Sequence, residues 1–430
     1  MYATRTGKAG HGAAIKKWRG WLRQLGPGLI TGAADDDPSG IATYSQAGAQ
    51  FGYQLAWTVV IAYPLVAGIQ LVSAAIGRVT GNGLAANIRN CFPKPVVYAV
   101  ILLLLIANTI NIAADIAAMG EALRLVLGGP AHFYAVFFGG VSVALEIFVS
   151  YRRYVRFLKW LTLALLCYAA ALFSVSVPWK EVIEGTLRPD VAVTGDLVTV
   201  VVAVFGTTIS PYLFFWQAAQ EVEEVKASPT DAPLKDAARG AQRQLRRIRF
   251  DTFAGMGFSN AIAWCIIVST GATLHSAGVT DIESAAQAAE ALRPIAGNFT
   301  FLLFSLGIIG TGLLAIPVLA GSAAYAVAET FGWKGGLDLK LYQAQRFYAI
   351  VAIATLGGAL LSLTKLDPMK ALFWSAVING MVAPPIMLVM MLLARNTRVM
   401  GTFTVGPLAS WLGWIATTVM AAAVVAMFVA

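Results

Sequence analysis

The chain has 430 residues and is poor in charged residues, histidine and cysteine. Charged side chains make up 12% of it, about half the share typical of soluble domains, while hydrophobic residues make up 58%. This composition excludes an ordinary soluble domain. Cys91, Cys167 and Cys265 are scattered without a Cys-x-x-Cys pair, which argues against a disulfide framework and against a thiolate metal site. Neither a His-Glu-x-x-His nor a Gly-x-Ser-x-Gly motif occurs, so nothing indicates an enzyme.

Long polar stretches are also scarce, and the loop 226–249 is the longest candidate for a separate element. A membrane-spanning helix needs about 20 mostly apolar residues. Eleven segments meet that requirement and predict an all-α integral membrane protein with one membrane domain. The segments are 26–52, 54–77, 95–127, 133–150, 155–178, 195–225, 250–275, 298–328, 342–362, 368–394 and 406–429.

The net charge of +9 is unevenly distributed along the chain. Most of the 31 basic residues lie in the tail 1–25 and in every second loop, and the opposite side holds only Lys180, Arg188, Arg293, Lys365 and Lys370. The positive-inside rule then places the N-terminus in the cytoplasm and the C-terminus outside. The basic charge is therefore a signal of topology in the plasma (inner) membrane, with the lipid bilayer as partner, and not of nucleic-acid binding. We expect the first span to be retained, because no short cleavable signal sequence precedes it.

Three acidic residues, Asp35, Asp36 and Asp37, interrupt the first apolar segment near its middle. Charge at that depth costs a few kcal/mol per residue, so it is rare unless it has a function. Pro38 and Gly40 disfavour a continuous helix, and unwound backbone in a membrane is tolerated around a cavity or buried in protein. The stretch therefore predicts a broken helix with a cation site.

Segment six has a second interruption at residues 206–211, Gly-Thr-Thr-Ile-Ser-Pro. Interruptions at matching positions of two halves are typical of inverted-repeat transporters with a binding site at the membrane midplane. The expected fold is a 5+5 inverted repeat with broken helices 1 and 6. Its parts are a tail 1–25, repeats 26–178 and 195–394, and an eleventh helix 406–429.

Four motifs give the chain a resemblance to a known family. They are Gly-Pro-Gly-Leu at 26–29, Asp-Pro-Ser-Gly at 37–40, Val-Thr-Gly-Asn-Gly-Leu-Ala at 79–85 and Gly-Thr-Thr-Ile-Ser-Pro-Tyr at 206–212. Together they resemble the signatures of Nramp divalent-metal transporters over segments one to ten. The resemblance implies the fold shared with sodium-coupled amino-acid transporters and alternating-access transport of a divalent ion. It implies no resident cofactor and no obligate protein partner.

The departures from the usual family motif indicate the ion. The family's Asn falls on Gly40, its metal-binding Met on Ser210 and its backbone-contributing Ala on Thr207, whereas Asp37 is retained. Oxygen ligands suit Mg²⁺, which keeps several of its waters, while a thioether favours softer metals. The same departures resemble an Nramp-related branch of magnesium transporters. We therefore expect Mg²⁺ transport into the cytoplasm, with Mn²⁺ as a second ion.

The other polar groups of the two breaks leave alternatives open. Asp36 is expected to face the same cavity as Asp37, and Asp35 either joins them, pairs with a base or caps a helix. The hydroxyls of Ser210 and Thr207 either contact the ion or its waters, or bond nearby backbone carbonyls.

Segment three carries Asn108, Asn111 and Asp115 on one helix face. The resemblance associates proton movement with Asp115 and a following acid, but that second position is Ala118. Tyr212 and Gln217 stand where the family places histidines, and the three histidines of the chain, His11, His132 and His275, lie in the tail or in outer loops. We expect transport without proton coupling. Asp115 either titrates or serves as a structural partner of the two asparagines.

Asn379 in segment ten either makes a contact near the ion or forms a hydrogen bond between helices. Two other transport functions compete with magnesium transport. One is a proton-coupled Mn²⁺ or Fe²⁺ symporter of the Nramp type. The other is a sodium-coupled carrier of an organic solute, which predicts a first break free of acids.

Overall fold

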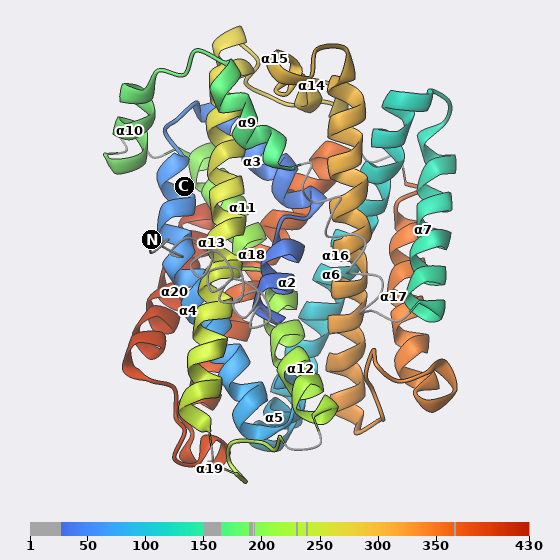
Figure 1. The fold of residues 1–430 in the computed structure, drawn as a ribbon, viewed down its shortest axis with the longest axis vertical. Coiled ribbons are helices and arrows are strands. Elements are labelled where there is room, and N and C mark those ends of the chain that lie inside the picture. The colour runs from blue at the N-terminus through green and yellow to red at the C-terminus, as the bar shows by residue number, and fades with distance from the viewer. Residues whose placement is uncertain are drawn as a thin grey trace, which may run out of the picture.

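The structure is a computed structural model that describes residues 27–149, 165–188, 192, 194–228, 231–237, 240–364 and 367–429. These residues form helices and connecting turns, with no β-strand among them (Figure 1). The first half of the chain contains α2 (Pro27–Asp35), α3 (Pro38–Phe51), α4 (Ala56–Thr80), α5 (Leu84–Cys91), α6 (Lys94–Leu127), α7 (Ala131–Phe148), α9 (Leu166–Ser174) and α10 (Trp179–Leu187).

The second half contains the longer elements α11 (Gly195–Thr208), α12 (Pro211–Ala227), α13 (Ala241–Thr273), α16 (Thr300–Phe331), α17 (Gln345–Leu361), α18 (Pro368–Arg395) and α20 (Pro407–Val429). Short helices connect them: η2 (His275–Ala277), α14 (Ala285–Glu290), α15 (Arg293–Ala296), η3 (Gly297–Phe299), η4 (Leu341–Gln343) and α19 (Thr397–Met400).

Eight helical stretches in the described part of the chain are long and apolar enough to cross a membrane. They correspond to predicted segments two, three, four, six, seven, eight, ten and eleven, while α17 covers segment nine with 17 residues. Residues 155–164 of segment five and the whole tail 1–25 lie outside the described residues, and the rest of segment five contains α9. The count of eleven spans, the repeat boundaries and the side on which each terminus lies therefore stay predictions.

Both predicted interruptions are present as breaks between two helices. Asp36 and Asp37 separate α2 from α3, and Ile209 and Ser210 separate α11 from α12. Pro38 and Pro211 each occupy the first position of the second half-helix. Proline is favoured there because the first backbone N–H groups of a helix have no partner within the helix. The prediction of two broken helices is confirmed.

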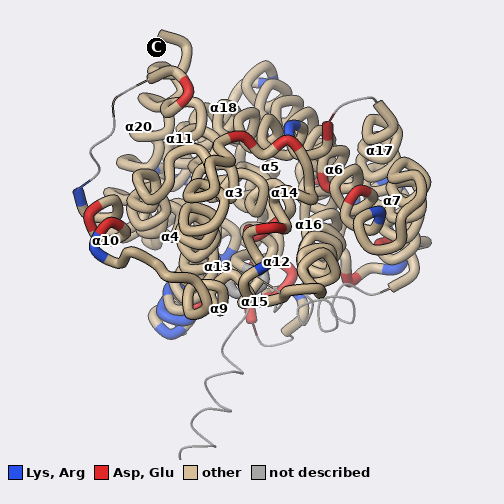
Figure 2. The backbone as a smooth tube through the Cα atoms, turned by 90° about the horizontal axis from the view of Figure 1, so that it is seen from above, with Lys and Arg blue, Asp and Glu red and all other residues tan. Residues whose placement is uncertain are grey.

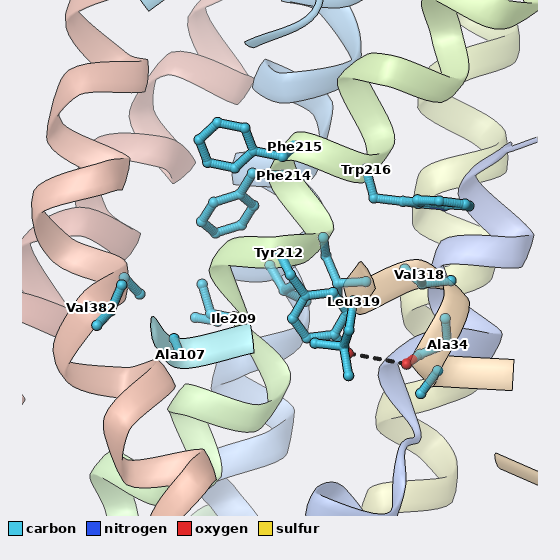
Figure 3. Packing of buried hydrophobic residues seen from close by; sticks show 14 of the residues in the cluster. Ala34, Ala107, Ile209, Tyr212, Phe214, Phe215, Trp216, Val318, Leu319 and Val382 are labelled. Carbon is cyan, nitrogen blue, oxygen red and sulfur yellow. Dashed lines mark hydrogen bonds between the residues drawn. The ribbon is translucent and has the colours of Figure 1, made fainter. Parts of the chain in front are cut away.

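The broken helices lie inside the bundle and are covered by the longer helices (Figure 1). Helix α2 packs closely on α13, where a β-carbon on Gly32 would lie 2.4 Å from the carbonyl oxygen of Gly255. Most of the chain around this centre carries no charge (Figure 2). Aromatic residues 212, 214, 215 and 216 of α12 are buried, with Tyr212 on the side of Ala34 in α2 and Phe214 and Phe215 pointing away from it (Figure 3). This packing buries α12 within the bundle.

Candidate cation site

The two breaks meet at a buried polar cluster. The hydroxyl oxygens of Ser39 in α3 and Thr207 in α11 lie 3.5 Å apart. Gly40 faces the same hydroxyl, since a β-carbon at Gly40 would lie 3.2 Å from Thr207 Oγ1. We call this cluster, together with Asp37, Asn111, Asp115 and Asn379, the cation site. Its side chains are at most 2% exposed.

Asp37 is the N-cap residue of α3, and its carboxylate accepts three hydrogen bonds. Oδ1 accepts from the hydroxyl of Ser39 at 2.6 Å and from the backbone N–H of Gly40 at 2.8 Å. Oδ2 accepts from the amide of Asn111 at 2.9 Å. All three partners are donors, so together they fix the carboxylate in one orientation.

Asn111 of α6 links three helices around this carboxylate. Its amide nitrogen donates to Asp37 and, at 3.2 Å, to Oδ2 of Asp115. Its amide oxygen accepts from the amide nitrogen of Asn379 in α18 at 3.1 Å. Asn379 thus both joins two helices and orients the residue that contacts Asp37. Oδ1 of Asp115 has no hydrogen-bond partner within the described part of the chain.

Asp35 and Asp36 face a different helix from Asp37. The hydroxyl of Ser259 in α13 lies 2.7 Å from Oδ2 of Asp35 and 2.9 Å from Oδ1 of Asp36. Among the described residues Asp35 pairs with no base, and the N-cap of α3 is Asp37. Asp36 therefore lies beside the break, but its carboxylate contacts α13.

The hydroxyl of Ser210 bonds backbone in this structure. It donates to the carbonyl oxygens of Gly206 at 2.7 Å and Thr207 at 2.8 Å, which is the second of the two alternatives for this residue. Asn108 is not part of the cluster, since its amide donates to the carbonyl of Leu319 and to the hydroxyl of Ser322 in α16. It shares a helix face with Asn111 but serves the contact between α6 and α16.

Tyr212 and Gln217 bond the helix that precedes the first break. The hydroxyl of Tyr212 donates to the carbonyl oxygen of Ala34 at 3.1 Å (Figure 3). The side-chain oxygen of Gln217 accepts from the hydroxyl of Thr31 at 2.5 Å. Asp251 of α13 accepts from the backbone N–H of Gly28 at 2.7 Å. Three polar contacts, about one helical turn apart, therefore hold α2 against α12 and α13.

The charge of this region is one-sided. Asp35, Asp36, Asp37 and Asp115 are all buried, and none of them forms an ion pair with a base in the part of the chain that the structure describes. Buried carboxylates of one sign repel one another and strongly attract cations. No three His, Cys, Asp or Glu side chains among the described residues are grouped to hold a metal ion by themselves. The site therefore suits a cation that keeps other ligands, such as water.

A pocket of about 380 Å³ opens at the end of the bundle that carries α14 and α15. It lies between α3, α11, α18 and residues 281–282. Its polar lining consists of Gln46, Gln50, Asp196, Thr199, Asp281 and Lys370. Ala42, also in the lining, belongs to α3, the half-helix that Asp37 caps.

Sequence reasoning missed Ser39 and Ser259, which contact the acids, and Asp251, which bonds the backbone of Gly28 in α2. Ser39 belongs to the quoted motif at 37–40, and its place two residues after Asp37 is the usual spacing for a local hydroxyl bond to a carboxylate. Ser259 lies in the apolar part of α13 and Asp251 lies at the start of that part, so both could be recognised as polar residues of a spanning segment. Their partners in α2, however, are more than 200 positions away in the sequence.

Comparison with known proteins agrees with the fold. The family model described as "Nramp: Natural resistance-associated macrophage protein-like" matches residues 28–430. The divalent metal cation transporter MntH of Acidiphilium cryptum is 25% identical over 409 residues, which cover 90% of this chain and 86% of that protein.

Two solved structures have a similar arrangement of helices. The manganese transporter of Eremococcus coleocola has a TM-score of 0.75 at 16% identity, covering 98% of this chain and 88% of that one. Mhp1, a nucleobase-cation-symport-1 family transporter, has a TM-score of 0.59 at 15% identity, covering 93% and 91%. These likenesses establish the inverted-repeat transporter fold.

Proposed function

The chain belongs to the Nramp family, and on that premise we propose that it is a divalent metal cation transporter whose main ion is Mg²⁺, with Mn²⁺ as a second ion. The named relatives include a divalent metal cation transporter and a manganese transporter. The proposed activity is transport across the plasma (inner) membrane into the cytoplasm, not catalysis. The metal is the substrate, and the proposal includes neither a resident cofactor nor a protein partner.

The observation that carries the choice of Mg²⁺ is the surroundings of Asp37. A carboxylate offers about four lone-pair positions, and the groups of Ser39, Gly40 and Asn111 take three of them. Asp37 then has room for one direct bond to an ion or for contact through a water. None of its partners offers sulfur. Mg²⁺ usually keeps several waters and binds one or two carboxylates, so its chemistry matches this arrangement.

The neighbouring groups support a hydrated ion in the same way. Gly40 and Ser210 are smaller than the Asn and Met of the usual family motif, and the hydroxyls of Ser39 and Thr207 flank the break. Hydroxyl, amide and backbone carbonyl oxygens can bond the waters of the ion. The four buried carboxylates then supply attraction without replacing the hydration shell.

The proposed transport cycle uses the two breaks. An ion that arrives through the pocket between α3, α11 and α18 meets Asp37 at the start of α3. Release on the opposite side requires α2 to separate from α12 and α13, which breaks the contacts made by Gly28, Thr31 and Ala34. The site is closed to solvent on both sides in the present conformation, as alternating access requires of an intermediate.

A proton-coupled Mn²⁺ or Fe²⁺ symporter is the second candidate, and one observation favours it. Asp115 is fully buried and is linked to Asp37 through Asn111, whose amide bonds both carboxylates. A proton on Asp115 could leave as the ion arrives. Against this, Ala118, Tyr212 and Gln217 replace the other groups that the family resemblance associates with proton movement. A sodium-coupled carrier of an organic solute has the least support of the three candidates, because four buried acids disfavour an anionic substrate.

Calorimetric titration of the purified protein with Mg²⁺, Mn²⁺ and Cd²⁺ tests the choice of ion. We expect binding of Mg²⁺, competition by Mn²⁺ at the same site, and little gain for Cd²⁺ because the groups of Ser39, Gly40 and Asn111 that bond Asp37 are not soft ligands. Tight Cd²⁺ binding with no detectable Mg²⁺ binding would instead support the second candidate.

A further inference from the structure

A second pocket, of about 370 Å³, opens between α4, α13 and the segment that leads into α20. Leu71, Leu245, Ile248 and Leu408 contribute to its largely apolar lining. Arg249 is the one charged residue of the lining, and no carboxylate takes part. None of these residues belongs to the cation site.

The position of this pocket along the helices is informative. Helix α4 ends at Thr80, α13 begins at Ala241 and α20 begins at Pro407, all at the end of the bundle that carries α5 and α19 (Figure 1). At 1.5 Å per residue, Arg249 lies about 12 Å from the start of α13. The pocket therefore spans the level at which lipid headgroups give way to hydrocarbon. The distribution of basic residues predicts that this is the cytoplasmic side.

The arginines of α13 fall into two groups. Arg247 is held by acids, with distances of 3.0 Å to Glu221 and 2.7 Å to Glu224. Arg246 and Arg249 are exposed and form no ion pair with any described residue. They are three positions apart and so lie on neighbouring parts of the helix surface. Arg247 has a structural partner, whereas these two are available to an external anion.

We propose that this pocket binds an anionic glycerophospholipid of the inner leaflet. One acyl chain packs against Leu71, Ile248 and Leu408, and the phosphate accepts hydrogen bonds from Arg249 and Arg246. Guanidinium groups bind phosphate in a bidentate manner, and basic pockets between spanning helices on the cytoplasmic side are suited to anionic headgroups. The complementary charge at the rim selects an anionic lipid over a zwitterionic one.

The bound lipid would join α13 to the start of α20, a helix that is otherwise largely exposed. It would also support the helix whose Asp251 bonds Gly28 of α2. The proposal does not depend on which metal is transported, because no residue of the cation site takes part.

Native mass spectrometry of the full-length protein tests the proposal, with palmitoyl-oleoyl phosphatidylglycerol and the matching phosphatidylcholine as probes. We expect the wild type to retain one phosphatidylglycerol in preference to phosphatidylcholine. The double variant Arg246→Gln/Arg249→Gln should bind it about 25-fold more weakly, at roughly fivefold for each arginine. Arg395→Gln, which removes an exposed arginine of α18 outside the pocket lining, is the matched control and should bind like the wild type.

A second variant, Ala75→Phe, fills the apolar part of the pocket while keeping both arginines. It should also lose the bound lipid, provided that its elution profile and helical content match the wild type. Equal retention of the two lipids by the wild type, or undiminished phosphatidylglycerol binding by the double variant, would overturn the proposal. So would a dimer whose contact covers this pocket.

Discussion

At the scale of single residues, Asp37 has two roles that the fold combines. It caps α3, which satisfies backbone groups at the start of that helix, and it presents a carboxylate to the break. The cap alone contributes about 1 kcal/mol, so its loss is tolerable for folding. In the proposed function, binding of a cation depends on the negative charge of the Asp37 carboxylate.

Replacing Asp37 therefore separates the two roles. Asp37→Asn keeps a side-chain oxygen for the cap but removes the charge, and we expect Mg²⁺ affinity to fall about 100-fold or more, as for other losses of one buried charged partner. Asp37→Ala should bind no Mg²⁺ that calorimetry detects. Glu283→Gln removes an exposed carboxylate outside the cation site and serves as the control. Wild-type affinity in Asp37→Asn would exclude this residue as a ligand.

The proposed function assigns ion selectivity to Gly40, Thr207 and Ser210 as a set. A side chain at position 40 meets Thr207 Oγ1, so Gly40→Asn alone should destabilise the contact between α3 and α11. The triple variant Gly40→Asn/Thr207→Ala/Ser210→Met removes that clash and adds a thioether. We expect it to raise the affinity for Mn²⁺ or Cd²⁺ relative to Mg²⁺ by about tenfold or more, measured by calorimetry. An unchanged ratio in a folded triple variant would mean that these positions do not set the selectivity.

At the scale of helices, α2 is held against α12 and α13 by three hydrogen bonds. Its backbone bonds Asp251 and Tyr212, and its Thr31 bonds Gln217. Each contact comes from a different turn of α2. Opening toward the predicted cytoplasmic side has to break all three, so each one stabilises the closed arrangement.

Tyr212→Phe tests this arrangement with little change in packing. The ring beside Leu319 remains, but the carbonyl of Ala34 loses its donor (Figure 3). An unsatisfied buried acceptor costs about 1–3 kcal/mol. Amide hydrogen exchange of α2 should therefore become roughly 5- to 150-fold faster. Tyr98→Phe, at an exposed position of α6, is the control, and equal exchange in both variants would argue against a closing role for Tyr212.

The sequence predicted the breaks because their causes are local. Acids, prolines and glycines within apolar segments disfavour a continuous helix wherever they occur. The partners across helices were not predictable in the same way. That Ser259 contacts Asp35 and Asp36, or that Asn379 reaches Asp37 through Asn111, depends on how α13 and α18 pack. Asn108 shows the limit most clearly, since sharing a face with Asn111 did not bring it into the site.

At the scale of the whole molecule, the transport energy is available without protons. A divalent cation that crosses an inside-negative membrane gains about 4.6 kcal/mol per 100 mV, which corresponds to more than a thousandfold concentration ratio. Asp115 of α6 is the acid that the family resemblance associates with proton movement, and its neighbour Asn111 does not titrate. We expect saturable, electrogenic and weakly pH-dependent transport.

Liposomes that contain the protein and a pH-sensitive dye test this expectation. The interior should not acidify while Mg²⁺ enters. Proton influx that scales with metal uptake would contradict uncoupled transport and would point to Asp115. The variant Asp115→Asn should then abolish the proton signal.

The central claim is that this protein moves Mg²⁺ across the membrane by way of Asp37. The most direct measurement is Mg²⁺ uptake into liposomes under an imposed inside-negative potential, for the wild type and for Asp37→Ala reconstituted at equal density. The account predicts saturable uptake by the wild type, inhibition by added Mn²⁺, and no uptake above that of empty liposomes for the variant. Absence of Mg²⁺ uptake in a wild type that transports Mn²⁺, or equal uptake by both proteins, would contradict it.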